Sequence, residues 1–321
     1  MATMPSQFLS CDWGTSSFRL RLVSTRTGEV VAEIKNDQGI KTLSESANLR
    51  RIGRPDVFAR VMRQSLVELA AQHPLAGAPL VISGMASSTI GWKELPYAKT
   101  PFPLDGTGLR VEQFDWESEL DIGATYIVSG VATASNIMRG EECQVIGLLA
   151  YEEFRSLRQR SIVILPGTHS KHILIEDEMV TDFQTYMTGE LFEALGKHTI
   201  LSASCNMAAP VHRHSDFHDG VRYVRQNGLA ASLFKVRTRA VLDNVSENRN
   251  TAFLSGLLIG AELADLDQYG DRPAIVAAPE ELLDLYRAAM ADRKHAEFIS
   301  EIGRLTVAAH GLILSHVLKH V

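Results

Sequence analysis

The sequence has few of the features that mark secreted or membrane proteins. Only three cysteines occur, Cys11, Cys143 and Cys205, and they are far apart with no CxxC spacing, which favours reduced thiols in a cytosol. The N-terminus, MATMPSQFLSCDW, lacks a basic region followed by a long apolar stretch, so we expect no secretory signal. The longest apolar segment, FLSGLLIGAELADL, is interrupted by glycines and is too short to span a bilayer. We therefore expect a cytoplasmic protein without a membrane partner.

A strongly basic block is also missing. The 32 basic and 38 acidic side chains give a net charge of −6, so nucleic acid is not an expected partner. The acidic balance means that any anion site must be local, built from backbone amides or a few cations. The phosphate-binding patterns GxxxxGK[ST] and GxGxxG are absent from any strand-turn-helix context, which excludes the two commonest nucleotide loops.

The chain instead shows the same order of elements twice. Its 321 residues predict two domains of about 150 residues each. Residues 8–34 read as an antiparallel meander, followed by a helix that Pro55 opens and a buried strand, PLVIS. Residues 161–186 again read as strand, turn, strand, turn, strand, and Thr188 is expected to cap the helix that follows. Further helices are expected over 215–244 and 250–266, then a strand-helix pair, RPAIVAAPEELLDLYRAAM, and a final helix.

A glycine turn heads each copy of the meander. Superposing Gly14 of DWGTSS on Gly167 of LPGTHS places Thr15 on Thr168. Such a turn presents consecutive backbone N–H groups and hydroxyls to one point, which suits a phosphate oxygen. A single copy would be an ordinary hairpin turn, but two copies at domain spacing indicate a polyphosphate held by both. Only the first copy carries an acid, Asp12, which fits a Mg²⁺ role.

These segments resemble a known superfamily and, within it, one family. DWGTSSFRLRL and PGTHSKHILIEDEMV resemble the two phosphate motifs of the actin and hexokinase superfamily, and RPAIVAAPEELLDLYRAAM resembles its adenosine segment. More narrowly, GMASSTIGWKELPY, IMRGEECQ, LPGTHSKH, MTGELFEAL and FLSGLLIGAEL resemble the 2-dehydro-3-deoxygalactonokinase family, in the family's order from about residue 8 to about residue 312.

The resemblance implies a fold. It implies an α/β protein with the two-domain actin-like ATPase (ribonuclease H-like) fold, in which each domain is a mixed five-stranded-type sheet flanked by helices, with a cleft between the domains. The domains would cover residues 1–160 and 161–321, and the last helix is expected to pack back on the first domain.

The resemblance also implies a reaction. ATP, with Mg²⁺, would phosphorylate the terminal hydroxyl of 2-dehydro-3-deoxy-D-galactonate, giving the 6-phosphate. Another sugar or sugar-acid kinase of the same superfamily is the main alternative. A non-catalytic sugar-sensing regulator is disfavoured, because little sequence precedes the first strand for a helix-turn-helix domain. An actin- or chaperone-like assembly protein would need insertions that this chain lacks. A homodimer stays open.

Site residues are carried over from matching motifs. Sugar kinases of the superfamily place the catalytic base in a Gly-Asp pair at a helix start, which Gly140 and Glu141 match here. Glu142 is the alternative base, and ordinary helix capping competes with both. Asp12 is expected to bind the metal, or less plausibly to act as the base. The expected phosphate contacts are Gly14, Thr15, Ser16, Gly167, Thr168, His169 and Ser170.

The remaining candidates each carry an alternative. Lys171 either neutralises phosphate charge or points to solvent, and Gly256 either admits adenosine or lets helices pack closely. Ala277 and Ala278 stand where the family's adenosine turn usually has glycine. Arg139 is expected to pair with the substrate carboxylate.

The expected wall of the substrate site comes from the loop after PLVIS. Its members are Ser83, Gly84, Met85, Trp92 and Tyr97. Loop packing is an equal alternative for Trp92 and Tyr97. The stretch VHRHSDFHD offers His212, His214, Asp216 and His218 as metal ligands, but a polar surface loop is preferred there.

Overall fold

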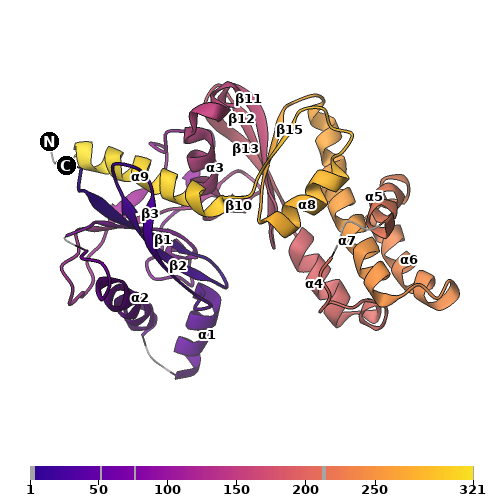
Figure 1. Cartoon of the computed structure of the whole chain (residues 1–321), viewed down its shortest axis with the longest axis horizontal. Coiled ribbons are helices and arrows are strands. Elements are labelled where there is room, and N and C mark those ends of the chain that lie inside the picture. The colour runs from indigo at the N-terminus through magenta and orange to yellow at the C-terminus, as the bar shows by residue number, and fades with distance from the viewer. Residues whose placement is uncertain (1–3, 51–52, 76, 212–214, 321) are drawn as a thin grey trace. The chain divides into compact units, whose positions relative to one another are not determined.

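The computed structural model describes residues 4–50, 53–75, 77–211 and 215–320. The chain forms two compact units (Figure 1). The first contains the chain up to Gln159, the segment Ile175–Asp182 and the residues from Gly303 onwards. The second contains Arg160–Leu174 and Phe183–Ile302.

A six-stranded sheet, in the order β3-β2-β1-β4-β8-β7, lies at the centre of the first unit. Its strands are β1 (Gln7–Trp13), β2 (Phe18–Ser24), β3 (Val30–Asn36), β4 (Leu80–Gly84), β7 (Val111–Gln113) and β8 (Thr125–Val128). The predicted antiparallel meander of β1, β2 and β3 is confirmed. Strands β4 and β8 continue the sheet in parallel. The carboxyl ends of β1 and β4 therefore lie next to each other.

Helices cover the first sheet because its apolar residues need partners on both faces. They are α1 (Ile40–Arg50), α2 (Arg54–Ala70), α3 (Glu141–Ala150) and α9 (Ile302–His320), with 3₁₀ turns at Met85–Ser87 and Glu152–Arg158. Pro55 lies in the first turn of α2, as predicted, and Phe58, Met62 and Leu66 of this helix pack in a core with Trp13. Three two-residue strands form a small separate sheet: β5 (Ala98–Lys99), β9 (Val131–Ala132) and β10 (Ile137–Met138).

Helix α9 packs on the strands of the meander (Figure 1). Its buried His310 has Nδ1 2.8 Å from Ser10 Oγ of β1. Arg21 alternates in β2 with the buried Leu20 and Leu22, yet its own side chain is also only 5% exposed. Its Nε donates to Glu33 Oε1 at 2.6 Å, and its guanidinium lies close to Gly303 of α9. The helix therefore covers a polar stripe of the sheet.

The second large sheet has the order β15-β14-β11-β12-β13-β6. Its strands are β6 (Phe102–Pro103), β11 (Arg160–Leu165), β12 (Ser170–Glu176), β13 (Met179–Tyr186), β14 (Ala274–Ala277) and β15 (Ala296–Ile299). Strands β11, β14 and β15 are parallel. Each large sheet thus has six strands rather than the expected five. The edge strands β7 and β6 are too short to show an alternating pattern in the sequence.

The described residues of the second unit form five helices. They are α4 (Thr188–His198), α5 (Ser215–Asn227), α6 (Leu229–Leu242), α7 (Glu247–Ala264) and α8 (Glu280–Ala289), with 3₁₀ turns at Ile200–Ser204 and Asp265–Tyr269. The expected cap on α4 is wrong, because Met187 is the N-cap and the Thr188 hydroxyl donates to Glu262 of α7 instead. No helix in the described ranges is long and apolar enough to cross a bilayer.

Close packing of α3 against α9 yields a stability prediction. A Cβ added at Gly147 would lie 1.7 Å from the Leu305 carbonyl oxygen, so Gly147→Ala must push α9 away. We expect the unfolding free energy to fall by about 1–3 kcal/mol, measured by urea denaturation monitored by circular dichroism.

Gly311→Ala on α9 is the matched control. Its added Cβ would be 3.7 Å from the Phe8 ring, an ordinary contact, and alanine favours a helix over glycine by up to about 1 kcal/mol. Equal destabilisation by the two variants would contradict the packing argument.

Candidate active site

Two glycines, Gly84 and Gly140, allow the ends of β1 and β4 and the start of α3 to meet in the first unit. Gly84 ends β4 with φ of +83°, and a Cβ added there would lie 2.7 Å from the Trp13 carbonyl oxygen at the end of β1. Gly140 precedes α3 with φ of +106°, and its added Cβ would be 3.4 Å from Gly84 Cα. Positive φ and close backbone approach both require glycine. The start of α3 therefore lies against the ends of β1 and β4.

Two carboxylates lie at this junction. Asp12 is next to Ser83 in the parallel pair, and its side chain is 19% exposed. Burial raises the pKa of Asp12, the nearby Arg19 and Arg21 oppose this shift, and the charge of Glu141 adds to it. Arg19 Nη1 is 3.4 Å from Asp12 Oδ2. Asp12 and Glu141, both partly accessible, thus interact electrostatically within one unit.

The next acid, Glu142, has a different environment. It is fully buried, and its Oε1 and Oε2 accept the Gly140 N–H at 2.9 and 2.8 Å. Burial, with the charge of Glu141 in second place, raises the pKa of Glu142 to about 7. Of the two base candidates, only Glu141 has an accessible carboxylate, while Glu142 braces the turn before α3.

Arg139 is a fixed cation beside the same turn. Its backbone N–H donates to Glu141 Oε2 at 2.8 Å. Its Nη1 donates to the Ser87 carbonyl oxygen at 2.6 Å and also to the Ser87 hydroxyl. Its guanidinium lies 4.2 Å from the centre of the Tyr97 ring, a cation–π geometry. Ser87 was not among the residues expected here, since the SGMASST loop offers no pattern that singles it out.

The expected substrate wall is only partly exposed. Trp92 is 8% exposed, and its ring makes edge contacts with Trp13, Phe114 and Trp116 at 5.8, 5.2 and 5.1 Å. It belongs to the core, so we do not assign it a substrate contact. Ser83 is also fully buried, whereas Met85 is half-buried.

The cysteines next to the site, Cys11 and Cys143, are buried. Burial is the main cause that raises the pKa of both Cys11 and Cys143. All three cysteines are unpaired. A thiol of raised pKa is a poor nucleophile at neutral pH.

The first phosphate turn is supported by the start of α1. Within the turn, the Gly14 N–H donates to the Ser17 carbonyl at 2.9 Å, and the Ile40 N–H donates to the Gly14 carbonyl at 3.0 Å. A Cβ added at Gly39 would lie 2.3 Å from the Thr15 carbonyl oxygen. Thr15 itself is exposed, as is the following residue, Ser16.

The second turn is supported in the same way by α4. The Glu190 N–H donates to the Thr168 carbonyl at 3.1 Å, and a Cβ added at Gly189 would lie 2.6 Å from the Gly167 carbonyl oxygen. Sequence reasoning missed Gly39 and Gly189. The signal was present, because each repeat has a glycine after its third strand, just before α1 in the first repeat and in the first turn of α4 in the second.

Three side chains of the second turn face different partners. His169 Nε2 lies 2.6 Å from Glu190 Oε2 in an exposed pair. Ser170 is fully buried. Lys171 is 3% exposed and its Nζ donates to the His169 carbonyl at 2.8 Å. It therefore does not point to solvent, and it holds the backbone of the turn.

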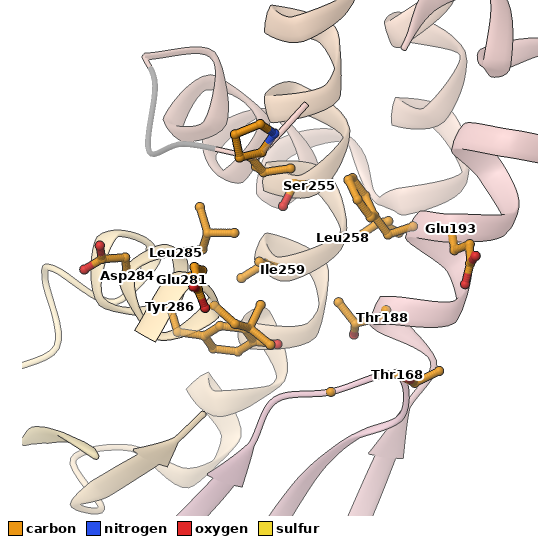
Figure 2. Close-up of a pocket in the computed structure, with 16 residues that line it drawn as sticks. Thr168, Thr188, Glu193, Ser255, Leu258, Ile259, Glu281, Asp284, Leu285 and Tyr286 are labelled. Atoms are coloured by element: carbon orange, nitrogen blue, oxygen red, sulfur yellow. The ribbon is translucent and has the colours of Figure 1, made fainter. Parts of the chain in front are cut away.

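A cavity of about 600 Å³ adjoins the second turn. Gly167, Thr168 and Thr188 line one part of it, and Figure 2 shows Leu285 and Tyr286 of α8 opposite Thr188. The apolar wall consists of Phe192, Leu258, Ile259, Leu282, Leu285 and Tyr286. This volume and lining are typical of a site for an organic ligand with a flat apolar part.

The adenosine candidates lie behind this wall rather than in it. Ala277 and Ala278 are 1% and 0% exposed, and the helix after them, α8, supplies the lining. A Cβ added at Gly256 would be 2.1 Å from the Phe217 carbonyl of α5, so Gly256 packs two helices while its neighbour Ser255 faces the cavity. Ala277, Ala278 and Gly256 are not among the residues that line the cavity.

Within the described ranges, no group of three or more His, Cys, Asp or Glu is arranged to hold a metal ion. His212 and His214 of the VHRHSDFHD stretch lie outside the described residues. Asp216 is buried and forms ion pairs with Arg239 and Arg249. The carboxylate of Asp216 is thus used in holding α5 to its neighbours.

The fold class follows from comparison with solved structures. The activator of 2-hydroxyisocaproyl-CoA dehydratase from Clostridium difficile, solved with bound ADPNP, has a TM-score of 0.51 at 12% identity, with 98% of each chain covered. That likeness concerns the fold alone. The chain is a two-domain α/β protein of the actin-like ATPase and sugar-kinase class.

The family is defined more narrowly. The model of the 2-keto-3-deoxy-galactonokinase family matches residues 12–313, and the chain belongs to this family. A Rhizobium meliloti protein named as a probable 2-dehydro-3-deoxygalactonokinase is 34% identical, over 82% of this chain and 81% of its own length. The 2-dehydro-3-deoxygalactonokinase of Escherichia coli is 29% identical, over 83% of this chain and 82% of its own length. A Sinorhizobium meliloti crystal structure assigned to the same kinase has a TM-score of 0.81 at 29% identity, covering 96% of both chains.

The buried Glu142 generates a pH prediction. Its pKa is about 7 in the folded protein against an ordinary 4.5, so between these values the folded chain holds a proton that the unfolded chain has lost. The contribution of Glu142 to the unfolding free energy is therefore fully present below pH 4.5 and is lost as the pH rises through 7. The total loss is on the order of 3 kcal/mol. Glu142→Gln removes this loss, so its unfolding free energy relative to wild type should rise from pH 5 to pH 8.

Urea denaturation at several pH values checks this expectation. Glu153→Gln changes an exposed acid of the same region and should follow the wild-type curve. Parallel pH profiles for wild type and Glu142→Gln would show that the buried carboxyl does not titrate in this range.

Proposed function

We propose that the protein is an ATP-dependent phosphotransferase that phosphorylates the 6-hydroxyl of 2-dehydro-3-deoxy-D-galactonate. The observation that carries the proposal is the family match over residues 12–313, together with the named relatives above. The residues at the junction of β1, β4 and α3 are chemically suited to it. They offer an accessible carboxylate, a second acid and a fixed cation.

Glu141 is the proposed general base. Its carboxylate is accessible at the N-terminus of α3 and interacts with Asp12. An ionised carboxylate within reach of the attacking hydroxyl can accept its proton during transfer. Glu142 is too deeply buried for this role, and we assign it the support of the Gly140 turn.

The residues present fit a nucleotide. A Cβ added at Gly167 would meet no atom within 4 Å, so the second turn leaves open space beside its backbone. The apolar wall of the cavity is suited to an adenine ring, and the Gly167–Thr168 end is suited to the phosphates. In the first turn, the exposed Thr15 and Ser16, beside Gly14, are proposed phosphate contacts.

Asp12 is the residue proposed to hold Mg²⁺. This ion usually keeps several waters and binds one or two carboxylates plus substrate phosphates, so a single partly exposed acid fits it without a larger cluster. When bound, the ion would neutralise charge on the transferred phosphoryl group. Arg19 is 3.4 Å from Asp12 and holds this carboxylate in place.

Arg139 is the proposed partner of the substrate carboxylate. Its Nη1 donates to Ser87 and its guanidinium stacks on the Tyr97 ring. The guanidinium is therefore held in place before substrate binds. A sugar acid has an anion for this cation, while a neutral hexose does not. Arg139 therefore favours the sugar-acid kinase over the alternative of a hexose kinase of the same superfamily.

The cytoplasm is the proposed compartment, because all three cysteines are unpaired. A small-molecule sugar acid is the proposed partner, and nucleic acid is not. Assembly as a homodimer is proposed without assigning an interface.

Glu141→Gln tests the proposed base. With ATP, Mg²⁺ and 2-dehydro-3-deoxygalactonate, a coupled ADP-release assay should give a kcat lowered by about 10²- to 10⁴-fold, the usual contribution of a positioned base. KM values should change little. Glu153→Gln is the control, since this exposed acid lies after α3. Full turnover in Glu141→Gln would remove Glu141 from the mechanism, and no turnover in the wild type would reject the proposed reaction.

Arg139→Gln tests the carboxylate contact. We expect KM for the sugar acid to rise by about 10- to 100-fold, because charge-assisted hydrogen bonds to the substrate are lost. KM for ATP should be unchanged. Arg139→Lys keeps the charge but loses the fork and the stacking on Tyr97, and should recover only part of the affinity. An unaltered sugar-acid KM in Arg139→Gln, as in the exposed control Arg110→Gln, would exclude this role.

A further inference from the structure

A buried carboxylate without an assigned role lies beneath the nucleotide cavity. Glu262 of α7 is 2% exposed. Its Oε1 accepts a hydrogen bond from His172 Nε2 at 3.0 Å. Its Oε2 accepts two more, one from the Tyr286 hydroxyl at 2.8 Å and one from the Thr188 hydroxyl. Buried acids persist when they are hydrogen-bonded in this way, and this one joins β12, α4, α7 and α8.

The hydrogen bonds have one possible direction along a chain that reaches the second phosphate turn. A carboxylate only accepts, so the single Tyr286 hydroxyl proton is used on Glu262. Ser170 Oγ lies 3.3 Å from that hydroxyl, and must therefore donate to it. The Gly167 N–H in turn donates to Ser170 Oγ at 3.4 Å. The order is Gly167, Ser170, Tyr286, Glu262.

We propose that Glu262 is a positioning residue for nucleotide binding, acting through Tyr286 and Ser170 on the Gly167 turn and through Thr188 on the start of α4. This inference rests on the proposed function of the cavity as a nucleotide site. Tyr286 and Thr188 line the cavity (Figure 2), but Glu262 and Ser170 are not among its lining residues. Glu262 therefore touches no nucleotide, and it sets the shape of the groups that do.

The direction of the chain also revises the role of Ser170. Because its proton goes to Tyr286 and its oxygen accepts from Gly167, the hydroxyl has no proton left for a phosphate. Ser170 acts on the turn and not on the ligand. The N–H groups after Gly167 and the hydroxyl of Thr168 remain for the phosphates.

Variants of the full-length protein that remove a single hydroxyl oxygen test this series of hydrogen bonds. Tyr286→Phe keeps the ring in the cavity wall and removes only the hydroxyl, and Ser170→Ala removes the next link. Each should raise the Kd for ADP, measured by isothermal titration calorimetry, by about 3- to 10-fold, the range for one lost hydrogen bond. KM for ATP should rise likewise, and KM for the sugar acid should not.

The double variant separates positioning from general destabilisation. Both changes cut the same chain, so Tyr286→Phe with Ser170→Ala should weaken ADP binding no more than the stronger single change. Glu262→Gln, which keeps one acceptor oxygen, should weaken ADP binding less than the double variant. Tyr223→Phe on α5 is the matched control, since this half-buried tyrosine packs in another cluster, and its ADP affinity should equal the wild type's.

The outcomes distinguish the inference from the proposed function. Wild-type ADP affinity in both Tyr286→Phe and Ser170→Ala overturns the inference and leaves the kinase assignment standing. An additive loss in the double variant, or an equal loss in Tyr223→Phe, also overturns it. Failure of the wild type to bind ADP overturns both. If Tyr286→Phe does not fold, Ser170→Ala alone decides, by the split between the ATP and sugar-acid KM values.

Discussion

Backbone contact at glycine is the constraint on which both phosphate turns depend. A turn that offers its N–H groups to an anion must direct its carbonyl groups elsewhere. Here the backbone N–H groups at a helix start donate hydrogen bonds to these carbonyls. Ile40 and Glu190 donate to the turn carbonyls, and they can approach only because the residues before them, Gly39 and Gly189, have no side chain. A Cβ at either position would overlap the turn itself. The helix start thus holds the turn in the conformation that we propose to bind phosphate.

Three buried acids illustrate how one residue type takes different roles. Glu142 is held by a backbone N–H, and burial raises its pKa to about 7, so it braces a turn at the cost of pH sensitivity. Glu262 accepts three side-chain hydrogen bonds and orders a network. Asp216 is neutralised by two arginines and holds helices together. Asp12 and Glu141 instead stay partly accessible, which is why we propose that these two acids act on a ligand.

Much of the fold was predictable because its signals are local. The alternating strands of both meanders, the Pro55 helix start and the strand-helix pair at 274–289 all follow from patterns within a short window. The two glycine turns were also found, since a repeated motif is visible in one sequence. Helix α1, with few apolar residues, and the two-residue strands have no such pattern and were missed.

The candidate site was less predictable, because burial and partners depend on residues distant in the sequence. Ligand contact was one of two interpretations for Trp92, beside loop packing, and for Lys171, beside solvent exposure. In the structure Trp92 joins an aromatic core and Lys171 folds back on its own turn. Glu262 lies 92 residues after Ser170 and 24 before Tyr286, so its connection to Ser170 through Tyr286 cannot be seen in the sequence. Glu141 and Glu142 are adjacent in sequence, yet the helix they begin turns one outward and the other into the core.

The two repeats have diverged in what surrounds a common turn. In the first unit, the parallel strand β4 and the start of α3 bring acids and Arg139 to the turn's neighbourhood, which suits proton transfer and recognition of a charged sugar. In the second unit, α7 and α8 bring an apolar wall and a network of neutral hydroxyls, which suits a flat base and a precise phosphate grip. A turn of this kind does not discriminate between phosphate ligands, because backbone N–H groups bind any phosphate. Specificity must therefore come from the side chains that each unit adds. We therefore expect the elements that follow each meander, rather than the meander itself, to decide what the protein binds.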